Sequence, residues 1–106
     1  MNKIIDIETF NTFINSNSLI LVVAKTNNCG VCDVVLSKVE QLLEKYPNIK
    51  SSQIIIDEVP EFAGQYVVFT APTILLLVDG KEILRESRFI NFSELDNKIK
   101  RIDELY

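Results

Sequence analysis

Residues 19 to 35 have the sequence LILVVAKTNNCGVCDVV, and this stretch decides the expected fold. Its first part, Leu19 to Lys25, is a continuous apolar run rich in β-branched residues, as in a central strand that is covered on both faces. Its second part begins a helix. The only two cysteines of the chain, Cys29 and Cys32, stand at the junction with the spacing C-x-x-C. A buried strand that leads into a helix predicts an α/β fold.

The segments on either side continue the alternation of strand and helix. Apolar runs predict four further strands, at Lys3–Ile7, Gln53–Asp57, Thr73–Val78 and Glu82–Ser87. Apolar residues spaced by three and four predict helices at Glu8–Ser16, Gly30–Tyr46, Val59–Tyr66 and Phe92–Tyr106. Asp79-Gly80 favours a tight turn between the last two strands, which makes the sheet mixed. The order βαβαβαββα predicts a three-layer α/β/α sandwich, formed by residues 1–106 as a single domain.

Charge and hydropathy exclude two classes of partner. The chain has 11 Lys and Arg against 15 Asp and Glu, a net charge of −4, whereas phosphate binding needs clustered basic residues. The longest apolar run, Leu19 to Ala24, is far shorter than the roughly 20 residues of a membrane-spanning helix, and the N-terminus has no apolar signal region. We therefore expect a cytoplasmic protein that binds neither nucleic acid nor membranes.

The two cysteines allow three interpretations at this point. Since the cytosol keeps ordinary disulfides reduced, a cytosolic C-x-x-C is more often catalytic, redox-sensing or metal-binding. Structural zinc needs four nitrogen or sulfur ligands, and the chain has two cysteines and no histidine, so a metal would have to be shared between two chains. Two buried cysteines without chemistry are the third interpretation, because the pattern alone is short.

The redox interpretation assigns a role to each residue of the motif. A helix N-terminus offers unpaired N–H groups and the positive end of the helix dipole, which favour a thiolate. Cys29, nearer the start of the helix, is the expected nucleophile, and Cys32, one turn later, is the expected resolving thiol. We expect Gly30 to permit a tight turn and to leave space for a substrate.

With the cysteines placed, the chain resembles the thioredoxin family over nearly its whole length. The matching stretches are CGVC at 29–32, IIIDEVPEFAGQYVV at 54–68 and APTILLLVDGKEI at 71–83. The resemblance implies the thioredoxin fold with a cis-proline at Pro72. It further implies that a substrate binds beside the dithiol, in contact with Asn28, Gly30, Val31, Ala71 and Pro72.

The function that this resemblance implies is reduction of protein disulfides through the Cys29/Cys32 dithiol. A protein of this kind needs no bound cofactor and no metal, and a separate reductase restores the dithiol after each cycle. We expect it to act as a monomer on protein disulfide substrates.

Several residues depart from the family pattern. Asn28 stands where the family usually has a Trp directly before the first cysteine, and Val23 and Gln53 stand where the family has a buried acid and its lysine neighbour. Asp33 follows Cys32 where a lysine is common, and Phe89 falls near a glycine that shapes the family's substrate groove. These departures define the alternative hypothesis, a binding or redox-sensing module on the same fold with slow or no general reductase activity.

Overall fold

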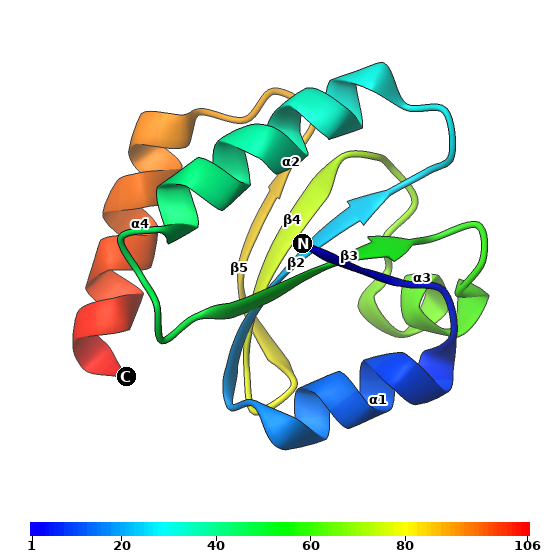
Figure 1. Ribbon diagram of the computed structural model, residues 1–106, viewed down its shortest axis with the longest axis horizontal. Helices are drawn as coiled ribbons and strands as arrows, with labels where there is room; N and C mark the ends of the chain where they lie inside the picture. The colour runs from blue at the N-terminus through cyan, green and yellow to red at the C-terminus, as the bar shows by residue number, and fades with distance from the viewer.

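The structure is a computed structural model that describes all residues from 1 to 106, and it has the predicted order of elements (Figure 1). The strands are β1 (Asn2–Ile4), β2 (Leu19–Lys25), β3 (Lys50–Ile55), β4 (Thr73–Val78) and β5 (Lys81–Ser87). The helices are α1 (Ile7–Ser16), α2 (Gly30–Leu43), α3 (Pro60–Tyr66) and α4 (Phe92–Leu105). No helix combines the length and the apolarity needed to cross a membrane.

The five strands form one mixed sheet in the order β1-β3-β2-β4-β5. β3 runs parallel to both β1 and β2, whereas β4 runs antiparallel to β2 and to β5. Figure 1 shows α1 and α3 on one side of the sheet and α2 and α4 on the other. The predicted three-layer sandwich and the central position of β2 are therefore confirmed.

Aromatic side chains fill the layer between the sheet and the α1/α3 face. The rings of Phe10 and Phe62 lie 4.9 Å apart, centroid to centroid, in an edge-on arrangement, and Phe10 meets Tyr66 in the same way at 5.9 Å. Phe10 and Phe62 are fully buried. The Tyr66 hydroxyl donates a hydrogen bond to the carbonyl of Gly80, at 2.7 Å, so its polar end is satisfied in the turn between β4 and β5. This cluster joins α1 to α3.

The opposite layer joins α2 to α4. α2 ends at Leu43 and not at Tyr46 as the apolar spacing predicts, because the backbone N–H of Tyr46 bonds to the carbonyl of Leu43, at 2.9 Å, in a tighter turn. That turn brings the Tyr46 side chain inward. Its hydroxyl donates to the Asp96 carboxylate on α4, at 2.5 Å, and Lys45 pairs with the same carboxylate.

The burial of Tyr46 at this contact makes the stability of the fold depend on pH in the alkaline range. Burial, with a smaller effect of the hydrogen bond to Asp96, raises the pKa of Tyr46 to about 12. Because this folded-state pKa lies above the unfolded value of about 10, the contribution to stability is complete below pH 10 and is lost as pH rises through about 12. We expect denaturant titrations of Tyr46→Phe to show a shallower loss of stability between pH 10 and 12 than the wild type. Parallel pH profiles would contradict this.

The edge of the sheet differs from the sequence prediction. β1 and β3 both begin earlier than expected, so that Ser51 and Ser52 lie within β3. The Ser52 hydroxyl donates to the carbonyl of Asn2, and the Gln53 amide donates to the carbonyl of Met1, both at 2.9 Å. Ser52 and Gln53 are tolerated in this strand because each finds a backbone carbonyl at β1 or at the residue directly before it. An apolar pattern does not reveal such partners.

Two chain reversals use left-handed backbone. Asp79 and Gly80 have φ values of 50° and 80°, which confirms the predicted turn between β4 and β5. Val67, directly after α3, has a φ of 54°, although a β-branched residue is disfavoured there. Arg85 holds this end of α3, because its guanidinium donates to the carbonyls of Tyr66 and Val67. These bonds involve only the backbone of Val67.

We expect Val67→Gly to stabilise the fold by about 1 kcal/mol, because the left-handed strain is relieved and a 63% exposed side chain loses little packing. For a chain of this size the melting temperature should rise by about 4–8 °C, measured by circular dichroism. Val34→Gly is the matched control, since Val34 is similarly exposed but lies within α2. Glycine there should lower the melting temperature. A lower value for Val67→Gly would refute the assignment of strain.

Candidate active site

The two cysteines lie where β2 passes into α2. Cys29 is the N-cap of α2, and its sulfur accepts a hydrogen bond from the backbone N–H of Cys32, at 3.2 Å. The Cα atoms of the two cysteines are 5.2 Å apart, and the pair is joined in a disulfide. Cys32 is fully buried, whereas Cys29 is partly exposed. Only Cys29 is accessible to a large substrate.

The charge of Asp33 beside the dithiol is compensated. Asp33 lies in the first turn of α2, and its carboxylate accepts a hydrogen bond from the Lys25 ammonium at 2.8 Å. The Lys25 side chain is only 13% exposed and comes from the end of β2. The sequence showed Asp33 directly after Cys32 but gave no sign of Lys25, since the two residues meet only after the chain turns between β2 and α2. The Lys25 ammonium therefore offsets part of the charge that Asp33 brings to the helix N-terminus.

Removing this compensation should disfavour the Cys29 thiolate. We expect Lys25→Met to slow alkylation of the reduced Cys29 about two- to three-fold near neutral pH, the range of a partly exposed ion pair. The measurement is the pH dependence of alkylation of the reduced protein by iodoacetamide. Lys50→Met is the control, because Lys50 lies at the other end of the sheet, where it pairs with Ile20. Identical pH profiles for the two variants would contradict a role of Lys25 at the site.

Pro72 reaches the same end of the sheet. Thr73, the first residue of β4, pairs with Ala24 near the end of β2, so the loop before β4 lies at the edge from which the cysteine loop leaves. The Ala71–Pro72 peptide bond is cis, Pro72 is buried and Ala71 is half-buried. The Thr73 hydroxyl donates to the carbonyl of Thr70 at 2.7 Å and fixes the loop.

The other predicted substrate contacts surround Cys29. Asn28 and Gly30 are exposed, and Val31 is 64% exposed. A side-chain carbon added to Gly30 would meet no atom within 4 Å, in agreement with open space there. The tight turn, however, comes from Asn28, with a φ of 59°, and not from Gly30, which is the first residue of α2.

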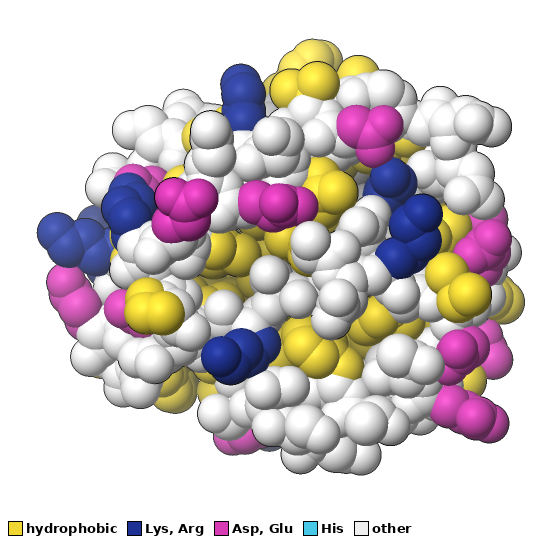
Figure 2. All heavy atoms as spheres, viewed as in Figure 1, with side chains coloured by type: hydrophobic (Ala, Val, Ile, Leu, Met, Phe, Trp, Pro, Cys, Tyr) yellow, Lys and Arg dark blue, Asp and Glu magenta, His cyan; other side chains and the backbone are white.

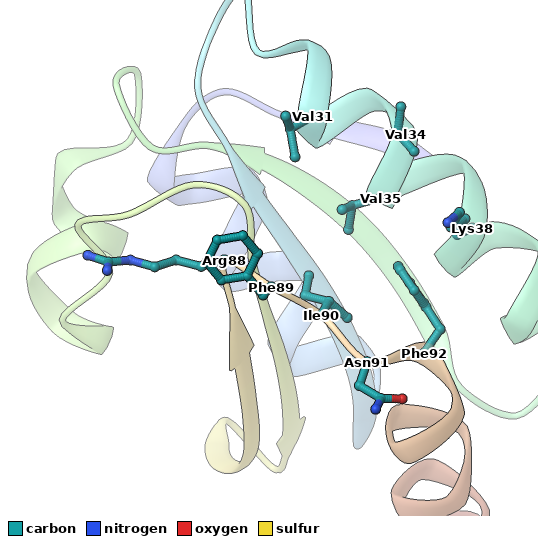
Figure 3. Close-up of a pocket in the computed structure, with 9 residues that line it drawn as sticks. All are labelled: Val31, Val34, Val35, Lys38, Arg88, Phe89, Ile90, Asn91 and Phe92. Carbon is teal, nitrogen blue, oxygen red and sulfur yellow. The ribbon is translucent and has the colours of Figure 1, made fainter.

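A pocket of about 450 Å³ borders the site on the α2 side (Figure 3). One wall is α2, and the other is the segment between β5 and α4. Its lining consists of Val31, Val34, Val35, Lys38, Arg88, Phe89, Ile90, Asn91 and Phe92. The sequence indicated only Val31 and Phe89 as site residues, because residues 88–91 belong to no element with a recognisable period. Phe89 is 98% exposed, and Arg88 before it has a φ of 64°.

The positions of the family's buried acid and lysine carry no charge in this chain. Val23 is fully buried and contributes to the apolar cluster between the sheet and α2. Gln53 is mostly buried, and its amide is occupied by the carbonyl of Met1. A proton that leaves Cys32 has no carboxylate at these positions to accept it.

Comparisons with known proteins agree with the fold and with the cysteine pair. The thioredoxin family model matches residues 2–101. The thioredoxin-like protein YdfQ of Bacillus subtilis is 39% identical over the whole chain and 92% of its own length. A thioredoxin-like protein from Bacillus cereus is 42% identical, with a TM-score of 0.68 over 88% of this chain and 98% of that one. Thioredoxin from Fasciola hepatica is 30% identical, with a TM-score of 0.82 over 95% of this chain and 98% of that one.

A cysteine pair at disulfide distance, at the start of the helix that follows the central strand, defines a thiol-disulfide oxidoreductase on this fold. The chain belongs to the thioredoxin family.

Proposed function

We propose that this protein reduces disulfides in other proteins, with Cys29 as the nucleophile and Cys32 as the resolving thiol. In the first step the Cys29 thiolate attacks one sulfur of the substrate disulfide. A bond forms between Cys29 and that sulfur, the substrate S–S bond breaks, and the other substrate sulfur leaves as a thiolate that takes a proton from water.

In the second step Cys32 completes the reduction. The Cys32 thiol loses its proton and attacks the Cys29 sulfur, and the second substrate thiolate leaves. Two electrons have then passed from the dithiol to the substrate, and Cys29 and Cys32 are joined as a disulfide. A separate reductase must supply two electrons to restore the dithiol.

The observation that carries this assignment is the hydrogen bond from the Cys32 backbone N–H to the Cys29 sulfur. A sulfur in the N-cap position faces unpaired N–H groups, which stabilise it more as a thiolate than as a thiol. Its partial exposure supports attack on a large substrate. The complete burial of Cys32 supports a role confined to the intramolecular step.

The same proposal places the substrate against Asn28, Gly30, Val31, Ala71 and Pro72. These five assignments are supported by position, because all five residues border the cysteine loop or the loop before β4, and both loops lie at one edge of the sheet. The backbone of Ala71 is positioned to pair with an extended substrate strand. We place the protein in the cytoplasm, acting as a monomeric single domain, because a reductase of this type needs a compartment that keeps supplying electrons.

The test is reduction of insulin disulfides by dithiothreitol, with and without the protein. We expect the protein to accelerate precipitation of the insulin B chain. The alternative, a binding or sensing module, predicts no acceleration, and that result would overturn the proposed function. Protein with both cysteines alkylated beforehand is the control for effects that do not need the dithiol.

A further inference from the structure

The surface next to the dithiol on the α2 side combines apolar and basic side chains. Figure 3 shows Val31, Val34 and Lys38 along one wall of the pocket, which faces Phe89, Ile90 and Phe92. Three of these apolar residues are strongly exposed, Val31 by 64%, Val34 by 56% and Phe89 by 98%. In Figure 2, hydrophobic side chains gather at the top of the view, over the N-terminal part of α2, with a basic side chain beside them.

The charge of this pocket is opposite to that of the whole chain. The chain carries a net charge of −4, yet the only ionised residues that line the pocket are Lys38 and Arg88. Neither residue takes part in any of the five ion pairs of the structure. Lys38 is held at the pocket by Phe92, because its ammonium lies 5.3 Å from the centre of that ring. In Figure 3 the Arg88 side chain extends away from the apolar lining. Lys38 is therefore the charged side chain that lies beside the apolar lining.

From this arrangement we propose that the pocket selects protein disulfides in which an apolar residue stands directly before or after the cysteine and an acidic residue stands three positions beyond the apolar one. This inference rests on the proposed function. Val31 lies between the two cysteines, so an apolar residue next to the substrate cysteine contacts Val31 and Phe89. Lys38 lies two helical turns further on, about 10 Å along the axis, and an extended peptide covers this in about three residues. The carboxylate therefore belongs three residues beyond that apolar residue, which is four residues from the substrate cysteine.

The test compares disulfide-linked homodimers of two peptides that differ only in a Glu or a Lys four residues from the cysteine, with Leu next to the cysteine. Peptides with these residues before and after the cysteine cover both chain directions. The rate constant for reduction of each dimer by the reduced protein is measured by acid quenching and mass spectrometry. We expect the Glu peptide to react about five-fold faster, the range of a partly exposed ion pair, and the difference to shrink at high salt.

Lys38→Glu should reverse this preference. Lys81→Glu changes the net charge equally but lies at the Asp79-Gly80 turn, at the opposite end of the sheet, and should keep the preference. If both peptides are reduced, equal rates in the wild type, or the same preference in Lys38→Glu, would overturn the inference.

A binding measurement separates this inference from the proposed function. The variant with both Cys29→Ser and Cys32→Ser is titrated with labelled peptides that carry Ser in place of Cys, and fluorescence polarisation reports affinity. Tighter binding of the Glu peptide supports the pocket assignment even if the wild type reduces neither peptide, an outcome that would overturn the proposed function alone. Equal affinity together with equal rates of reduction would overturn the pocket assignment alone.

Discussion

Cys29→Ser is expected to abolish disulfide reduction completely, with insulin precipitation at the rate of dithiothreitol alone. In the proposed mechanism the partly exposed sulfur of Cys29 attacks the substrate, and a hydroxyl does not exchange with disulfides. The fold should survive, because the serine oxygen can accept the same cap hydrogen bond from the backbone N–H of Cys32. Unchanged circular dichroism would establish this. Substantial activity in Cys29→Ser would refute its role as the nucleophile.

Cys32→Ser separates the two steps of the same reaction. The first attack by Cys29 remains possible, but the mixed disulfide is no longer resolved, so the variant should accumulate covalent adducts with its substrates. Non-reducing electrophoresis of the variant, incubated with an oxidised protein, should show a band that disappears on reduction. Because Cys32 is fully buried, Cys29→Ser should form no such band. Adducts in Cys29→Ser, and none in Cys32→Ser, would reverse the two assignments.

The sequence predicted the fold best where an element is apolar throughout. β2 and β4 have their predicted bounds, because strands buried on both faces appear as uninterrupted apolar runs. The prediction was weakest at β1 and β3, at the sheet edge, where Ser52 and Gln53 gain partners on a strand distant in sequence. A hydrogen bond between positions about fifty residues apart leaves no local pattern.

The same distinction applies to the site. The C-x-x-C spacing and the strand before it placed both cysteines, since those relations are local. The Lys25–Asp33 ion pair, the left-handed Asn28 and the pocket wall at residues 88–92 could not be predicted, because each depends on how loops meet in space. The dithiol could therefore be identified from the sequence, whereas these surrounding features could be identified only from the structure.

The site can keep its geometry only on a stable core. Phe10→Ala tests that core, and its expected effect is the second large one. We expect Phe10→Ala to destabilise the protein by about 3–5 kcal/mol, because it removes a fully buried ring and leaves a cavity between α1 and α3. That loss is a large share of the 5–15 kcal/mol typical of a domain. Urea titration followed by circular dichroism measures it.

Phe89→Ala is the matched control for Phe10→Ala, because it makes the same change at a side chain that is 98% exposed. It should alter stability by less than about 0.5 kcal/mol, as surface substitutions usually do. The two variants then distinguish a phenylalanine that stabilises the fold from one that does not. Phe10 stabilises the layer between the sheet and helices α1 and α3, whereas Phe89 leaves its ring to solvent beside the dithiol, where we propose that it contributes to binding. Similar losses of stability in both variants would contradict that division.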